Sequence, residues 1–138
     1  VCRHLVWTLT RPEEALREWF RILKPGGRIL IYDGDWATPK PLGRLVARLI
    51  ALIDFCVGAD RNYDGALSDR HGRIMQALPF GHGLQAAELI PLLEKVGFGA
   101  IDVHSHEPIA RAQRKGANLR NRLRTFVYRR FILTCSKP

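Results

Sequence analysis

The residues with the clearest chemical potential follow a short apolar run. Residues 29–32 are rich in β-branched side chains, which predicts a buried strand, and Asp33, Asp35 and Trp36 come directly after it. In open α/β sheets, ligands bind outside the carboxyl ends of the strands. We therefore expect these three side chains to line a ligand site.

Three side chains are candidates for a general base. His4 and Asp33 lie at the ends of predicted strands, and His82 lies in a glycine-rich loop. Histidine is the usual choice for proton transfer near neutral pH, and a carboxylate is the next. No catalytic pattern distinguishes one of the three, so the sequence leaves the catalytic residue open.

The cysteines and histidines do not form a ligand pattern. Cys2, Cys56 and Cys135 are odd in number and far apart, which argues against a disulfide framework or a zinc site and favours a reducing cytoplasm. His104 and His106 share one face of a predicted strand, but no third and fourth ligand accompany them. We therefore expect no metal centre, and no apolar run approaches the length that spans a bilayer.

The charge is strongly basic. The 138 residues carry a net charge of +9 at neutral pH, with a pI near 10.2. The basic side chains crowd into one segment without an acidic residue after Glu107: Arg111, Arg114, Lys115, Arg120, Arg122, Arg124, Arg129 and Arg130. Such a patch is typical of a surface that binds nucleic acid or an acidic membrane. Against this interpretation, few aromatic residues interleave with the arginines, and those present have the spacing of a strand core.

The first predicted helix and strand are separated by a tight reversal. Thr10 and Glu13 have the spacing of a capping box, so we expect a helix to begin there. Pro25 ends that helix, and we expect Gly26 and Gly27 to adopt positive φ angles that turn the chain into the strand. The remaining expected elements are an apolar helix over residues 42–55, a loop at 58–65, helices over 71–78 and 85–96, a half-exposed strand over 101–105, and a last strand that resumes at Phe131. The apolar helix packs on the sheet or, alternatively, forms a lid over an apolar substrate.

Several of these stretches resemble class I S-adenosylmethionine-dependent methyltransferases of the small-molecule type. The helix, the Leu-Lys-Pro-Gly-Gly turn, the strand and the acidic end within residues 12–36 match that family closely. The Leu-Leu-Glu-Lys-Val-Gly-Phe stretch at 92–98 resembles its helix end before the sixth strand, and residues 130–138 resemble its closing strand. Together with residues 3–9, the resemblance covers the C-terminal half of that domain and leaves 37–83 unmatched.

The resemblance implies a fold and a set of site residues. The fold is a single partial domain over residues 1–138: a Rossmann-like three-layer α/β sandwich, with a mostly parallel sheet and an antiparallel C-terminal strand pair. Residues 37–83 would be a substrate-side insertion. The implied cofactor is S-adenosylmethionine, with Cys2, Arg3 and His4 beside it. The implied acceptor site is formed by Asp33, Asp35, Trp36, Phe80 and His82.

The family's glycine-rich cofactor turn has no counterpart in these residues. By resemblance it belongs to an N-terminal half, and the chain begins with Val1 and has Met75 as its only methionine. We therefore expect a piece of a longer protein that is inactive alone and whose parent methylates a small molecule. The alternative is a nucleic-acid-binding module or an RNA methyltransferase that uses the basic segment. We expect Ala at both Asp33 and Asp35 to lower turnover without unfolding the protein.

Overall fold

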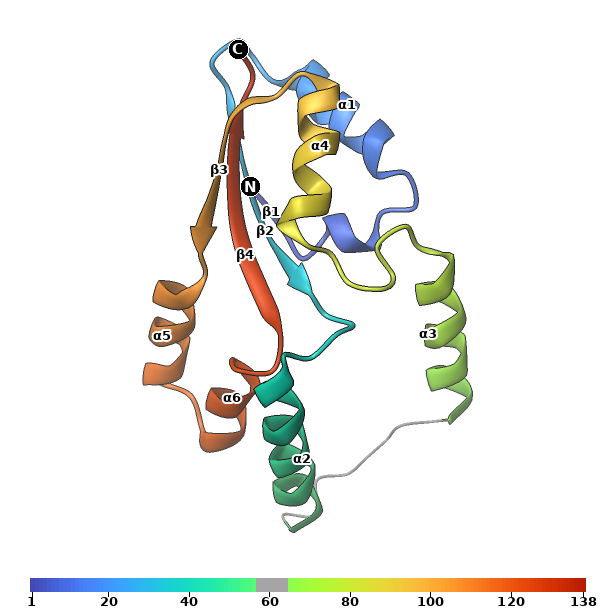
Figure 1. Cartoon of the computed structure of the whole chain (residues 1–138), viewed down its shortest axis with the longest axis vertical. Coiled ribbons are helices and arrows are strands. Elements are labelled where there is room, and N and C mark those ends of the chain that lie inside the picture. The colour runs from blue at the N-terminus through green and yellow to red at the C-terminus, as the bar shows by residue number, and fades with distance from the viewer. Residues whose placement is uncertain (57–64) are drawn as a thin grey trace.

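The computed structural model describes residues 1–56 and 65–138, with side chains from 69 onward in the second range, and contains a four-stranded sheet (Figure 1). The strands stand in the order β1-β2-β4-β3. Their bounds are Cys2–Arg3 for β1, Arg28–Asp35 for β2, Gly99–Ser105 for β3 and Arg129–Ser136 for β4. The helices are the 3-10 turn η1 (Val6–Thr8), α1 (Pro12–Ile22), α2 (Pro41–Cys56), α3 (Gly65–Ala77), α4 (Ala86–Val96), α5 (Glu107–Lys115) and α6 (Leu119–Arg124).

The direction of the strands corrects one expectation. Within the described residues only β1 and β2 run parallel, whereas β4 pairs antiparallel with both β2 and β3. The sheet is therefore mixed and mostly antiparallel, not mostly parallel. The physical reason is the position of β4, which lies between β2 and β3 and pairs antiparallel with each of them, so that β3 does not become a parallel neighbour of β2. The expected antiparallel pair at the C-terminus is confirmed.

The turn between α1 and β2 lies where the sequence indicates, but α1 does not begin as expected. Gly26 has the expected positive φ, 73°, and its N–H donates to the Lys137 carbonyl over 2.9 Å. This contact ties the turn to the end of β4. The positive φ expected at Gly27 is not found; glycine is needed there because an added Cβ would stand 2.7 Å from the Lys24 carbonyl oxygen. At the other end of α1, Arg11 is the N-cap and no side chain caps it, so the expected Thr10 capping box is wrong. A capping box is found instead at α4, between Gln85 and Glu88.

A single layer of helices covers the described part of the sheet. Leu16 of α1 and Leu89 and Leu93 of α4 are fully buried against Ile31 and Leu133 of the sheet. Figure 1 shows α1 and α4 side by side over this face. On the opposite face of the described residues most side chains are exposed or half-buried, namely Arg28, Leu30, Asp102, His104, Ile132 and Thr134, whereas Tyr32 near the end of β2 is buried. The described residues therefore form two layers, where a three-layer sandwich was expected.

Three helices gather beyond the carboxyl end of β2. Figure 1 shows α2, α5 and α6 at this end of the sheet. Gly43 of α2 lies so close to the segment after α6 that an added Cβ would stand 2.3 Å from the Val127 carbonyl oxygen, and Arg120 donates to Asp54 over 2.9 Å. The helix predicted over 42–55 is confirmed. Its packing on the sheet is not, because α2 packs against α6 and leaves Leu45 and Phe55 exposed.

The remaining segments extend or complete the predicted elements. The short helix expected over 71–78 is the longer α3, and the loop expected at 58–65 falls outside the described residues up to 64. The basic segment contains α5 and α6, two helices that were not expected from the sequence. None of the helices in the described ranges combines the length and hydropathy needed to cross a membrane.

Candidate functional site

The carboxylate of Asp33 is the organising group at the carboxyl end of β2. It is fully buried. Its Oδ2 accepts the N–H of Val6 over 3.0 Å and that of Trp7 over 3.4 Å, and its Oδ1 accepts the N–H of Gly34 over 2.9 Å and the indole N–H of Trp36 over 3.3 Å. A buried carboxylate is stable only when hydrogen bonds replace its lost hydration. Asp33 therefore fixes the turn after β1 and the Trp36 ring in one arrangement.

Asp35, the last residue of β2, has a similar role in the loop that follows. Its Oδ1 accepts the N–H groups of Ala37 over 3.1 Å and Thr38 over 2.7 Å. Gly83 lies against the same carboxylate with a φ of 112°, and an added Cβ would stand 2.1 Å from Oδ1. Only glycine fits this contact. The two acidic residues at the end of β2 thus shape the backbone around the site.

An aromatic cluster surrounds the tip of β1. His4 has a φ of 52°, and its ring stands edge-on to Tyr32 and Trp36, with centroids 5.0 and 4.7 Å apart. The guanidinium of Arg3 lies 5.4 Å from the centroid of the Tyr32 ring. We call His4, Tyr32, Trp36 and His106 the aromatic cluster. It joins β1, the end of β2 and the start of α5.

His4 carries a buried polar atom that has no hydrogen-bond partner among the described residues. Its Nδ1 is buried, and no group in the described ranges hydrogen-bonds it. Burial and the neighbouring charge of Arg3 lower the pKa of His4 from its ordinary value, although Asp33 acts in the opposite direction. The ring is therefore neutral near pH 7. A neutral imidazole with a free nitrogen can accept a proton or a hydrogen bond from a ligand.

His106 is neutral for a related reason but is already engaged. Burial and the charge of Arg130 lower its pKa to about 4. Its Nε2 shares a hydrogen bond with the Tyr32 hydroxyl, and the two rings stand 5.2 Å apart. His106 therefore anchors Tyr32, and its Nε2 is not free to bind a ligand.

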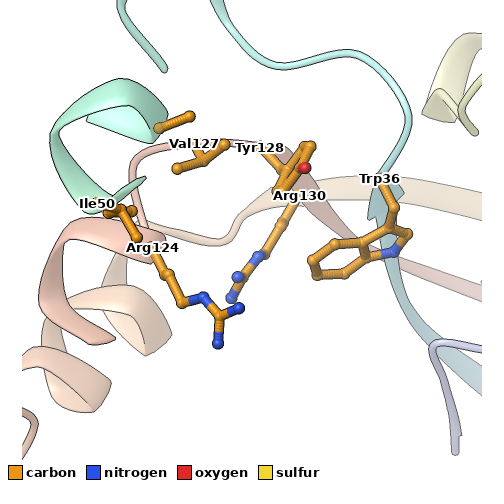
Figure 2. Close-up of a pocket in the computed structure, with 7 residues that line it drawn as sticks. Trp36, Ile50, Arg124, Val127, Tyr128 and Arg130 are labelled. Carbon is orange, nitrogen blue, oxygen red and sulfur yellow. The ribbon is translucent and has the colours of Figure 1, made fainter. Parts of the chain in front are cut away.

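A pocket of about 430 Å³ opens beside the cluster (Figure 2). Its lining comes from the residue after β2, from α2, from the last residue of α6, from the segment between α6 and β4, and from the start of β4: Trp36, Ala47, Ile50, Arg124, Val127, Tyr128 and Arg130. The Arg130 guanidinium lies 4.8 Å from the centroid of the Trp36 ring, and the Tyr128 ring lies 5.9 Å from it. Trp36 is shared by the pocket and the aromatic cluster, so the two form one continuous site.

The structure brings some of the predicted site residues together. Arg3, His4 and Trp36 meet at the aromatic cluster, and Cys2 is buried beside it with a pKa that burial raises. Asp33 and Asp35 border the site but are buried and occupied by backbone N–H groups. Their assignment to the acceptor site stays a prediction.

Two other predicted residues lie outside the cluster and the pocket. Phe80 is buried in the hydrophobic core. His82 is exposed, and its Nε2 lies 2.8 Å from the Glu88 carboxylate. Their roles at an acceptor stay predictions that this geometry does not support.

Five residues of this site were not predicted from the sequence: Tyr32 and His106 of the cluster, and Arg124, Tyr128 and Arg130 of the pocket. Tyr32 carries the one polar group of the predicted apolar strand, and this was a usable signal. The two arginines could not be distinguished within a run of similar residues. Only the fold of α6 onto α2 separates them from the rest.

Comparisons with known proteins agree with this geometry at the level of the fold. A family model for the methyltransferase domain matches residues 1–31. A search of curated proteins finds no match to the chain. Among solved structures, the chain is similar to phosphoethanolamine N-methyltransferase 2 of Haemonchus contortus in complex with phosphomonomethylethanolamine and S-adenosylhomocysteine, with a TM-score of 0.51 and 13% identity. A second structure of that enzyme, with S-adenosyl-L-methionine, gives a TM-score of 0.50 and 13% identity.

In both cases the alignment covers 99% of this chain and 32% of the Haemonchus enzyme. The chain thus spans about a third of those relatives. At this identity the likeness concerns the fold alone. Together with the domain match at the N-terminal end, it confirms a class I methyltransferase fold for the chain.

The buried hydrogen bonds of Asp33 correct the expectation that alanine at this position leaves the fold intact: we expect Asp33→Ala to destabilise the protein strongly. The change leaves the N–H groups that Asp33 accepts without a partner in a buried place. Each unsatisfied buried donor is costly, so the loss should be about 2–4 kcal/mol in the free energy of urea unfolding. The matched control is Asp102→Ala, which removes an exposed acid from β3 and should change stability by less than about 0.5 kcal/mol. Equal effects of the two variants would contradict the role of Asp33.

We also expect His106 to make the fold sensitive to acid. Its pKa is about 4 in the folded chain against 6.5 ordinarily, so between these values the unfolded state binds a proton that the folded state does not. The stability that His106 contributes is complete above pH 6.5 and is lost as the pH falls toward 4. After allowance for solvent screening, this is roughly 1–2 kcal/mol.

Urea unfolding at pH 7 and pH 4.5 measures the effect. His106→Gln cannot take up this proton, so it should lose less stability than the wild type on acidification. His104→Gln, at an exposed histidine of β3, should follow the wild type. A parallel loss of stability in all three proteins would show that His106 is not the source of the acid sensitivity.

Proposed function

We propose that this protein transfers a methyl group from S-adenosylmethionine to a small-molecule acceptor. The observation that carries the proposal is the junction of β1 with the end of β2. There a buried carboxylate holds the turn after β1 and Trp36 together, within a fold of the class I methyltransferase type. The domain match over residues 1–31 includes this first strand and the first half of β2.

The tip of β1 fits the cofactor in chemical terms. Arg3 is exposed there, and His4 offers a buried Nδ1 that no described residue satisfies. A polar ligand at this tip would supply the missing partner. S-adenosylmethionine, when bound, supplies a methyl group activated on a sulfonium. Arg3 and His4 would hold the cofactor's polar portion, while Cys2 lies behind them in the core.

The adjoining pocket would hold the acceptor. Methyl transfer is a direct displacement, so the protein contributes mainly by aligning the two reactants and excluding water. Trp36 borders both the β1 tip and the pocket, and it is held by Asp33 on one side and stacked by Arg130 on the other. A rigid shared wall of this kind would keep the acceptor aligned with the cofactor. Ala47 and Ile50 of α2 would close its apolar side.

Of the three candidate bases, the geometry favours His4. Asp33 is occupied by hydrogen bonds, and His82 lies on the surface with Glu88. His4 is neutral near pH 7 because its pKa is lowered, and its Nδ1 has no competing partner among the described groups. Because Nδ1 serves one partner at a time, His4 would take a proton from an acceptor hydroxyl or amine only in a complex in which Arg3 holds the cofactor's polar portion.

The rival proposal, nucleic-acid binding through residues 111–130, has less support. Several of the basic side chains in this segment are engaged within the chain. Arg114 pairs with Glu107, Arg120 pairs with Asp54, and Arg122 donates to the Ala117 carbonyl over 2.8 Å. These contacts leave a discontinuous set of free charges, where a phosphate backbone needs a continuous track.

We expect His4→Asn to weaken cofactor binding in the full-length protein by about tenfold, the effect of losing one good polar contact. Asparagine tolerates the positive φ at this position, so the backbone should not change. Calorimetric titration with S-adenosylhomocysteine measures the affinity. His104→Asn is the matched control, since β2 and β4 separate β3 from β1. If the wild type does not bind S-adenosylhomocysteine, the proposed function is wrong; equal affinity in all three proteins would remove His4 from the site.

A further inference from the structure

The pocket beside Trp36 combines apolar walls with two cationic groups. Ala47, Ile50 and Val127 form its apolar side, and Trp36 and Tyr128 form an aromatic side. Arg124 and Arg130 complete the lining, and none of the seven lining residues is acidic. Figure 2 shows both guanidinium groups pointing into the same open space, with the Trp36 ring beside Arg130.

Within the described part of the chain, these two charges are not neutralised. No carboxylate pairs with Arg124 or Arg130 in the described ranges, whereas Arg114 and Arg120 of the same segment each have one. The polar side-chain contact of Arg130 is a weak one, with Gln113 Oε1 at 3.5 Å, and its Nε is buried without an acceptor. The arrangement thus leaves hydrogen-bond donors of Arg130 unused inside a pocket.

Two like charges that converge on one space repel each other. An anion placed between them removes the repulsion and gives the free donors acceptors. The planar guanidinium matches the oxygens of a phosphate or a carboxylate, which it can bind with two parallel hydrogen bonds. The apolar and aromatic walls suit the uncharged remainder of the same molecule.

We infer that Arg124 and Arg130 bind the anionic group, a phosphate or a carboxylate, of a small acceptor whose apolar or aromatic portion lies against Trp36, Ile50 and Val127. This inference rests on the proposed function, since it names the class of acceptor for the same site. The volume of about 430 Å³ is within the range of small-molecule pockets. The stacking of Arg130 on Trp36 places the anionic end next to the shared wall and leaves the rest of the acceptor to extend along it.

Phenyl phosphate tests this inference, because it joins a phosphate to an aromatic ring. We expect it to bind the full-length protein in a calorimetric titration at low ionic strength, with benzoate as the carboxylate arm. Arg124→Gln and Arg130→Gln should each weaken the binding of phenyl phosphate about tenfold or more. Arg129→Gln is the matched control, since Arg129 is exposed on the same strand as Arg130 and does not line the pocket; its affinity should stay within about twofold.

Comparing several variants separates a loss of binding from a loss of folding. Arg130 contacts Trp36, so its replacement can disturb the cluster, but Arg124 makes no such contact in the described structure and gives an independent reading. Arg130→Lys keeps the charge without the planar fork and should bind phenyl phosphate with intermediate affinity.

Three results would overturn the inference. The first is a wild type that binds neither phenyl phosphate nor benzoate. The second is an equal loss of affinity in Arg129→Gln. The third is a single-stranded RNA that displaces phenyl phosphate at concentrations below the dissociation constant of phenyl phosphate itself, which would assign the arginines to nucleic acid.

A parallel titration with S-adenosylhomocysteine separates this inference from the proposed function. If the protein binds S-adenosylhomocysteine but neither anion, the inference of an anionic acceptor is wrong and the proposal of methyl transfer is retained. If the protein binds phenyl phosphate through both arginines but does not bind S-adenosylhomocysteine, the anion pocket is supported and the proposal of methyl transfer is wrong.

Discussion

A buried carboxylate with its hydrogen bonds satisfied is the interaction on which the site depends. Asp33 gains nothing from solvent, so its charge is stable only because Val6, Trp7, Gly34 and Trp36 donate to it. These donors come from the turn after β1 and from the end of β2. If either segment shifted, a charge would be left buried without partners, and this cost holds both in place. The same carboxylate therefore determines where His4 and the Trp36 ring lie.

The pocket follows from a second constraint, the close packing of α2 on α6. Gly43 allows the backbone of α2 to approach the Val127 carbonyl, and the ion pair of Asp54 with Arg120 holds the other end of the contact. This packing turns Ile50 toward the space in front of Trp36 and brings Arg124 and Arg130 to the same place. The helix predicted as a sheet-packing element thus serves as a wall of the pocket.

The sequence predicted the elements near the site better than the site itself. Pro25 and the glycines after it are local signals, and so the position of the turn into β2 was predicted correctly. Asp33 was chosen for its position at a strand end, but only three-dimensional contacts reveal that its oxygens are occupied by hydrogen-bond donors of the chain itself. A sequence pattern cannot separate an acid that faces a ligand from an acid that holds a turn together.

Long-range packing explains the other differences. The helical spacing of apolar residues in α2 predicts that one side of the helix is covered, but it does not say whether the sheet or α6 covers it. The strand directions depended on β4 entering between β2 and β3, a contact of residues about a hundred positions apart in sequence. In the sequence, Arg124 and Arg130 are two members of a basic run. Their place in one pocket is evident only from the packing of α6 on α2.

The central claim is that ligand chemistry takes place where the tip of β1 meets the end of β2. Amide chemical shifts of the full-length protein, followed by NMR during titration with S-adenosylhomocysteine, test it most directly. We expect the shift changes to concentrate on residues 2–7 and 33–36, while β3 stays unchanged. Changes confined to β3, or no changes at saturating ligand, would contradict it.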